Sequence, residues 1–452
     1  MSGVGYSVKF NQKINEYSKT INVDSDKSLS IRSVLFGAIS EGVSEVTNLL
    51  ESEDVFSSIN FVKTFGIKTK KISKGKHLIF GKGLGGFHAQ ENTKLNFGNS
   101  GTLCRLGCGI LSTNPNLKVI LSGDKSLKRR NLKSLFDVLS KFGAQFYPKN
   151  KNFLPIKLVS SSIPIGIEFV EKKGSAQMLS AVALAGLNTL AGKTKIIQKK
   201  EARDHTQIFL KNIGAELNIK KHKKNKIVEI LGKKKLNSFK ITIPGDPSSA
   251  AFFTALTILK KNSSLKIKNI GLNPTRIGFY QLLKKHGAKI KIEKLKKKNN
   301  EVVGNILVKS SKIKPIKAGP AFYSKTVDEF PILFVIAALN DGSSKFEGIK
   351  DLANKESNRI LEMKKLLKKI NINCKSDKNK MVIKGKRKLN KIEKTILVDP
   401  KLDHRICQSA AILALATGIS MKIKNFDTVN TSAPSFLKKI MQLGGKFEIQ
   451  KN

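Results

Sequence analysis

The stretch Phe142-Gly-Ala-Gln-Phe146 joins an amphipathic pattern to an alternating one, and close variants of it recur along the chain. Glycine adopts the left-handed backbone conformation that ends a helix without steric cost, and Asn is the next-best residue there. Each copy therefore predicts a helix, a left-handed stop and a short strand. The six predicted stops are Gly66, Gly143, Gly214, Gly287, Asn371 and Gly444.

The intervals between these successive positions are 77, 71, 73, 84 and 73 residues. This spacing is too long for a simple solenoid but regular enough to predict six copies of one α/β unit. Six units in 452 residues suggest two similar domains of three units each. We expect an α/β fold in which helices pack centrally and sheets face solvent on one side.

Two segments rich in residues that break helices and strands predict where the chain crosses between domains. Ile243-Pro-Gly-Asp-Pro247 separates the third unit from the fourth, and a second crossing is expected near Val23-Asp-Ser-Asp26. We therefore expect one domain over residues 23–244. Residues 1–22 and 245–452 are expected to form the other domain, which is discontinuous in sequence.

The formal charge of +51 raises the alternative of a nucleic-acid-binding protein, because basic faces supply most of the affinity for phosphates. The lysines are scattered, without aromatic interleaving or a binding motif, so we expect no nucleic-acid partner. Nine of the 84 cations are arginines, which leaves 84 − 9 = 75 lysines. Seven of the nine lie in polar clusters, where a planar two-donor fork suits an anion.

The cysteines and the apolar runs indicate the cellular compartment in which the protein is expected. The four cysteines show neither metal-ligand spacing nor a disulfide framework, which favours a reduced setting. The apolar runs are too short to span a bilayer, and the N-terminus has no signal or transit pattern. We expect a cytoplasmic protein with no metal, no cofactor and no membrane association.

A polar cluster over residues 351–360 predicts an anion site. Lys355 and Arg359 are four residues apart at what we expect to be the start of a helix, with Glu356 three residues before Arg359. Both cations would then lie on one face, close to a carboxyl that orients them. A solvated charged first turn is the simpler alternative.

A second such cluster occupies residues 24–32. Asp26 is predicted to cap a helix that continues to Gly37. Ser28 and Arg32 would share one face of that helix, and Lys27 would flank its start. An anion there would meet a hydroxyl, a guanidinium fork and a point charge.

Four further clusters have similar chemistry. Residues 97–105 are glycine-rich, so backbone amides can approach an anion at a helix start. Residues 123–130 supply adjacent guanidinium groups, although a basic surface turn is the better explanation of that cluster taken alone. Residues 173–177, which precede a helix predicted from Met178 to Leu187, and residues 201–206 combine groups that suit a phosphate.

Acidic residues also lie shortly before the apolar runs of two expected helices. Asp328 precedes the apolar run 331–339, and Asp403 precedes the run 410–415. Carboxyls in such positions can perform acid–base chemistry. His404 is expected to cap the second helix.

Together these motifs resemble the enolpyruvyl transferase family, in particular its branch that acts on shikimate 3-phosphate. In the family's order and spacing they are DKSLSIR, GNSGTLCRL, GDKSLKRR, GSAQ, EARDHT, PGDPSSAAF, NPTRIG, DEFP, NKESNRI and LDHRI. The resemblance covers nearly the whole chain. It implies two domains, each of three repeated βαβαββ units in an inside-out α/β barrel, with the active site in the inter-domain cleft.

The resemblance also implies an activity. The enolpyruvyl group of phosphoenolpyruvate would pass to the 5-hydroxyl of shikimate 3-phosphate, releasing phosphate through a tetrahedral intermediate. This is a step of the shikimate pathway and of aromatic amino acid biosynthesis, performed without a cofactor by what we expect to be a monomer. An enzyme acting on a UDP-amino sugar is the alternative within the family, but no Pro-Cys-Gly loop with a reactive cysteine is apparent.

Site residues follow from the resemblance, position by position. Those implied for shikimate 3-phosphate are Lys27, Ser28, Arg32, Ser175, Ala176, Gln177, Arg203, Asp328 and Lys355. Those implied for phosphoenolpyruvate are Lys27, Gly101, Thr102, Arg130, Gln177, Arg359 and Arg405. The implied catalytic residues are Asp328 as the base, with Glu356 or Lys27 as the acid. The sequence departs from the family pattern at Thr431, which takes the place of a lysine found in some members.

Overall fold

The computed structural model describes residues 5–451, and the chain divides into two compact units. The middle unit is Ser25–Ile243, and the terminal unit combines Met1–Asp24 with Pro244–Asn452. The domain boundaries expected from sequence, after residues 22 and 244, stay a proposal.

The middle unit contains seven helices and twelve strands within the described residues. Its helices are α1 Lys27–Ile39, α2 Glu53–Thr64, α3 Gly101–Thr113, α4 Lys125–Lys128, α5 Lys133–Ser140, α6 Ala176–Gly186 and α7 His205–Asn212. Its strands are β3 Glu41–Thr47, β4 Thr69–Ser73, β5 Lys76–Lys82, β6 Thr93–Asn96, β7 Lys118–Ser122, β8 Gln145–Tyr147, β9 Ile156–Val159, β10 Glu168–Glu171, β11 Lys193–Gln198, β12 Leu217–His222, β13 Asn225–Leu231 and β14 Lys240–Thr242.

The terminal unit repeats the same elements. Its helices are α8 Pro247–Leu259, α9 Gly278–Lys285, α10 Tyr323–Thr326, α11 Phe330–Ala338, α12 Arg359–Lys369, α13 His404–Thr417 and α14 Phe436–Gln442, with 3₁₀ turns η1 Pro320–Phe322, η2 Lys350–Asn354 and η3 Phe426–Thr431. Its strands are β1 Tyr6–Phe10, β2 Ser18–Ile21, β15 Ser264–Gly271, β16 Ile290–Lys298, β17 Glu301–Lys309, β18 Lys317–Ala318, β19 Gly342–Glu347, β20 Asn373–Ser376, β21 Lys380–Gly385, β22 Ile396–Val398, β23 Met421–Ile423 and β24 Glu448–Lys451.

The strands form six four-stranded sheets that share one topology. In the sheet β6-β7-β9-β8, the first pair is parallel and the other two pairs are antiparallel. A helix, α3, connects the parallel pair, as a parallel crossover requires. The other five sheets repeat this pattern of parallel and antiparallel pairs. The predicted βαβαββ repeat is therefore confirmed.

Strands distant in sequence complete three of these sheets. In the middle unit, β14 pairs in parallel with β3, with Lys240 opposite Glu45. In the terminal unit, β2 pairs with β15, and β1 lies between β23 and β24. The chain's first strands thus belong to sheets formed by its second half.

The six predicted stops are confirmed. Each follows the second helix of a repeat and has a positive φ, from 58° at Asn371 to 95° at Gly287. These left-handed residues turn the chain from helix into strand in every unit.

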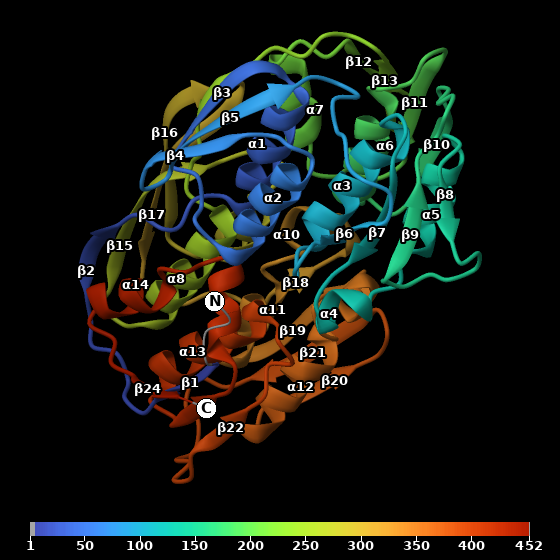
Figure 1. Cartoon of the computed structure of the whole chain (residues 1–452). Helices are drawn as coiled ribbons and strands as arrows, with labels where there is room; N and C mark the ends of the chain where they lie inside the picture. The colour runs from blue at the N-terminus through green and yellow to red at the C-terminus, as the bar shows by residue number, and fades with distance from the viewer. Residues whose placement is uncertain (1–4, 452) are drawn as a thin grey trace. The chain divides into compact units, whose positions relative to one another are not determined.

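One helix of each repeat is mostly buried, and these six helices are α1, α3, α6, α8, α11 and α13. All nine residues of α11 are buried, as expected for a helix that is apolar on every side. In the middle unit, α3 and α6 pack side by side (Figure 1), and a Cβ built on Gly109 would lie 2.4 Å from the Ala181 carbonyl oxygen. Glycine at 109 therefore permits close contact of the two backbones. Each unit has its own apolar core around these helices.

Candidate active site

Three buried helices of the middle unit begin with a side-chain cap. Asp26 accepts a hydrogen bond from the Leu29 amide at 2.8 Å, so the predicted cap of α1 is confirmed. Ser100 caps α3, and Ser175 caps α6, in the same way. The first turns of these helices hold six predicted substrate residues, and their amides make each start electropositive. Those six residues are Lys27, Ser28, Gly101, Thr102, Ala176 and Gln177.

Polar contacts connect these helices. The side-chain amide of Gln177 donates to the Thr102 hydroxyl at 3.0 Å, joining α6 to α3. Arg32 is buried, and its Nη1 donates to the Ser28 carbonyl oxygen at 3.0 Å. Two pairs of predicted substrate residues, Gln177 with Thr102 and Arg32 with Ser28, are thus in direct contact.

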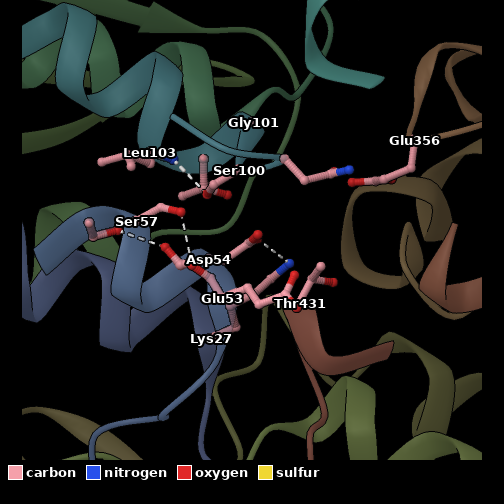
Figure 2. A network of polar contacts seen from close by, with 12 residues as sticks. Lys27, Glu53, Asp54, Ser57, Ser100, Gly101, Leu103, Glu356 and Thr431 are labelled. Carbon is pink, nitrogen blue, oxygen red and sulfur yellow. Dashed lines mark hydrogen bonds and ion pairs between the residues drawn. The ribbon is translucent and has the colours of Figure 1, made fainter. Parts of the chain in front are cut away.

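Lys27 forms an ion pair with a residue that the sequence analysis did not identify. Its Nζ lies 2.9 Å from Oδ2 of Asp54, which stands in the first turn of α2 (Figure 2). The Asp54 side chain is only 6 % exposed, so water screens this pair weakly. The partner lies 27 residues away in sequence, and no local pattern indicates it.

Gly101 lies beside two guanidinium groups. A Cβ built there would be 2.6 Å from Nη1 of Arg130 and 2.9 Å from Nη1 of Arg105. Asn99 accepts a hydrogen bond from Arg130, which fixes that side chain beside the start of α3. Arg105 is not one of the predicted site residues, although it is one of the seven arginines that lie in polar clusters of the sequence.

The loop before α6 is held by Glu171, another residue that sequence reasoning missed. Its buried carboxylate accepts hydrogen bonds from the amides of Lys173 and Gly174 at 3.0 and 2.5 Å. These contacts fix the approach to Ser175. Arg203 lies in the segment before α7 and is partly buried.

In the terminal unit, Arg359 lies among carboxylates. Its Nη2 is 2.7 Å from Glu356, which confirms the predicted pair, and its Nη1 is 3.6 Å from Asp328. Asp403 accepts from Nε at 2.9 Å. Burial alone would lower the pKa of Arg359, but the attraction of the carboxylates outweighs burial and raises the pKa above its usual value.

The helix expected over residues 351–360 is wrong at its start. Helix α12 begins at Arg359, whereas Lys355 follows the 3₁₀ turn η2 in an extended conformation. The Asn358 side chain caps α12 by accepting from the Leu361 amide, because short polar side chains compete with helix continuation. Lys355 and Arg359 therefore do not share a helical face.

The expected cap at His404 is also wrong. Asp403 caps α13 by accepting from the Arg405 amide at 2.9 Å, and His404 is the first helical residue. Arg405 is buried with its guanidinium 5.7 Å above the ring of Phe252, a cation–π contact. Thr431 donates its hydroxyl hydrogen to the Thr428 carbonyl oxygen.

Within residues 5–451, no group of three or more potential ligands is placed to hold a metal ion. The helices of this same range include none long and apolar enough to cross a membrane. The four cysteines are buried and free of disulfides.

The chain matches the family model for EPSP synthase (3-phosphoshikimate 1-carboxyvinyltransferase) over residues 11–440. The chain belongs to the EPSP synthase family. The family predicted from the motifs and its enzymatic class are thereby confirmed, and neither a UDP-amino sugar enzyme nor a nucleic-acid-binding protein is favoured.

Curated relatives agree with membership in the EPSP synthase family. The 3-phosphoshikimate 1-carboxyvinyltransferase of Zymomonas mobilis is 35 % identical over 440 residues, covering 97 % of this chain and 96 % of the relative. That of Petrotoga mobilis is 37 % identical over 418 residues, covering 92 % and 94 %.

Solved structures confirm the fold class. An EPSP synthase from Acinetobacter baumannii superposes with a TM-score of 0.84 at 31 % identity, covering 98 % of this chain and all of that chain. The enolpyruvyl transferase NikO from Streptomyces tendae has a TM-score of 0.77 at 12 % identity, covering 99 % of this chain and all of that chain, a likeness of fold alone.

Proposed function

We propose that this chain transfers the enolpyruvyl group of phosphoenolpyruvate to the 5-hydroxyl of shikimate 3-phosphate and releases phosphate. Beyond family membership, the observation that carries the proposal is the arrangement of three capped helix starts in the middle unit. They present six of the predicted substrate residues at electropositive first turns. Both proposed substrates carry a phosphate and a carboxylate, which such sites bind.

Shikimate 3-phosphate is assigned mainly to the middle unit. Ser28 and Arg32, one turn apart on α1, are proposed to bind its carboxylate. The first turn of α6, with Ser175, Ala176 and Gln177, is proposed to bind its phosphate together with Arg203 and Lys355.

Phosphoenolpyruvate is assigned to the seven residues that the family resemblance implies. Its phosphate is proposed to meet Arg130 at the start of α3, where Gly101 leaves room for it and Lys27, Thr102 and Gln177 complete the set. Its carboxylate is proposed to meet the guanidinium groups of Arg359 and Arg405, because a planar fork matches a carboxylate.

The proposed reaction proceeds in two stages. In the addition, Asp328 takes the proton of the 5-hydroxyl, whose oxygen bonds to C2 of phosphoenolpyruvate, while Glu356 or Lys27 protonates the C3 methylene. The tetrahedral intermediate then breaks its C2–O bond to phosphate. Loss of a methyl proton restores the double bond. Glu356 is held by Arg359 at 2.7 Å, which supports a fixed position for this group.

Product analysis tests the proposal. The protein is incubated with phosphoenolpyruvate and each of three acceptors in turn: shikimate 3-phosphate, unphosphorylated shikimate and a UDP-amino sugar. We expect equal amounts of enolpyruvyl product and phosphate with the first acceptor alone. Product formed only from the UDP-amino sugar would contradict the proposal. The monomeric state and the cytoplasmic location stay predictions.

A further inference from the structure

Two hydroxyl groups hold the guanidinium of Arg32 inside the middle unit. Nε donates to Oγ1 of Thr206 on α7 at 2.8 Å, and Nη2 donates to Oγ of Ser180 on α6 at 3.2 Å. Arg32 itself stands on α1, so this contact joins three helices. Arg32, Ser180 and Thr206 are each less than 5 % exposed, so water competes weakly for these hydrogen bonds.

Counting hydrogens fixes the direction of each hydroxyl. Both oxygens accept a hydrogen from Arg32, so each must point its own hydrogen elsewhere. Ser180 donates to the Ala176 carbonyl oxygen at 2.7 Å. Thr206 must therefore be the donor in its 2.6 Å contact with Ser180. The result is one ordered series of hydrogen bonds, from Thr206 through Ser180 to the first turn of α6, in which both hydroxyls donate their hydrogens.

This series of hydrogen bonds constrains how Arg32 can bind an anion. Nε and Nη2 lie along one side of the planar fork, and the two hydroxyls occupy that side. The two hydroxyls thereby fix the guanidinium plane at two points, and the Ser28 carbonyl oxygen, which accepts from Nη1, adds a third. All three partners are neutral, so they orient the group without compensating its charge.

We propose that Ser180 and Thr206 are positioning residues that orient Arg32 for the carboxylate of shikimate 3-phosphate. This inference rests on the function proposed above for Arg32. The same series of hydrogen bonds ends at Ala176 in the proposed phosphate site, so it connects the proposed carboxylate and phosphate sites of shikimate 3-phosphate.

Replacement of Thr206 tests the inference. Thr206→Val keeps the shape of the side chain but removes both hydrogen bonds, whereas Thr206→Ser keeps the hydroxyl and is the matched control. We expect Thr206→Val to raise the KM and Kd for shikimate 3-phosphate roughly tenfold, because a buried hydrogen bond to a charged group is lost. The KM for phosphoenolpyruvate and kcat should change less than about twofold. Thr206→Ser should bind shikimate 3-phosphate as wild type does. Ser180→Ala should act in the same direction.

A second ligand separates this role from a structural one. A shikimate 3-phosphate analogue without the ring carboxylate should bind wild type and Thr206→Val equally. Equal loss of both ligands, or unchanged binding of shikimate 3-phosphate by Thr206→Val and Ser180→Ala, would overturn the inference while leaving an active wild type and the proposed function intact. A wild type that forms no enolpyruvyl product would overturn the proposed function and this inference with it.

Discussion

The carboxylate of Asp403 accepts hydrogen bonds from Arg359 through both oxygens, at 2.9 Å from Nε and 3.3 Å from Nη2. The Arg359 side chain is 1 % exposed and that of Asp403 is not exposed at all. Asp403 also caps α13 and accepts from the Arg405 amide. One carboxylate therefore places both arginines that we assign to the carboxylate of phosphoenolpyruvate.

Asp403→Asn should destabilise the protein and weaken phosphoenolpyruvate binding. Asp403→Asn removes one of the carboxylates that compensate the buried Arg359, which keeps Glu356 at 2.7 Å, so the free energy of unfolding should fall by about 1 to 3 kcal/mol. Urea unfolding and the KM for phosphoenolpyruvate measure the two effects. The control is Asp399→Asn, which removes an exposed pair with Lys401 and should cost less than about 1 kcal/mol. Equal effects of the two substitutions would contradict the role given to Asp403.

Asp328→Asn should separate binding from catalysis. The amide keeps the shape of the side chain but cannot accept the hydroxyl proton, so kcat should fall by roughly 10² to 10⁴ while both substrates still bind. Rapid-quench kinetics and ligand titration measure these quantities. Weakened shikimate 3-phosphate binding with an unchanged kcat would make Asp328 a positioning residue, and Glu356 would become the candidate base.

Gly101→Ala should affect phosphoenolpyruvate selectively. The added Cβ would lie 2.6 Å from Nη1 of Arg130, so the guanidinium must shift away from the proposed phosphate position. We expect the KM for phosphoenolpyruvate to rise by roughly tenfold, with binding of shikimate 3-phosphate nearly unchanged. Gly319→Ala is the matched control, because a Cβ at 319 meets nothing within 4 Å. The two variants behaving alike would refute the steric argument.

These positions show what local sequence patterns could predict. The six left-handed stops and the cap at Asp26 depend on neighbouring residues, and both predictions are confirmed. The local pattern places the start of α12 too early, because Asn358, which caps the helix, is one of several short polar residues in that segment. Asp54 and Ser180 were missed for a different reason: their partners, Lys27 and Arg32, lie 27 and 148 residues away. Such pairings depend on tertiary packing, which no local pattern reports.

Asp24→Asn should stabilise the protein at neutral pH. Burial raises the pKa of Asp24 and outweighs the hydrogen bonds from Ser435 that lower it. A carboxyl with a raised folded pKa binds its proton more tightly in the folded state, so its contribution to stability falls as pH rises through that pKa. The neutral amide avoids this loss and can still accept from Ser435.

Urea unfolding at two pH values measures this effect. At pH 7 the midpoint of Asp24→Asn should exceed that of wild type, and the difference should shrink below a pH of about 4, where wild type is also protonated. A variant less stable than wild type at pH 7 would show that the ionised carboxylate is favourable there.

Removing part of the lysine charge should leave catalysis unchanged. Lys296 and Lys297 are exposed on β16, at the edge of its sheet, and neither belongs to the proposed sites. Changing both to Gln should keep turnover within a factor of about two, because exposed charges contribute little to local energetics. Steady-state rates at fixed ionic strength test this, and a large loss would show that the strand belongs to a binding surface.

The rate of phosphate release tests the central claim most directly. Wild-type protein is mixed with phosphoenolpyruvate alone, with shikimate 3-phosphate alone, and with both, and free phosphate is followed continuously. Enolpyruvyl transfer predicts release only in the third mixture, in proportion to enzyme and ending when the limiting substrate is consumed. Release from phosphoenolpyruvate alone at the same rate, or no release with both substrates present, would contradict it.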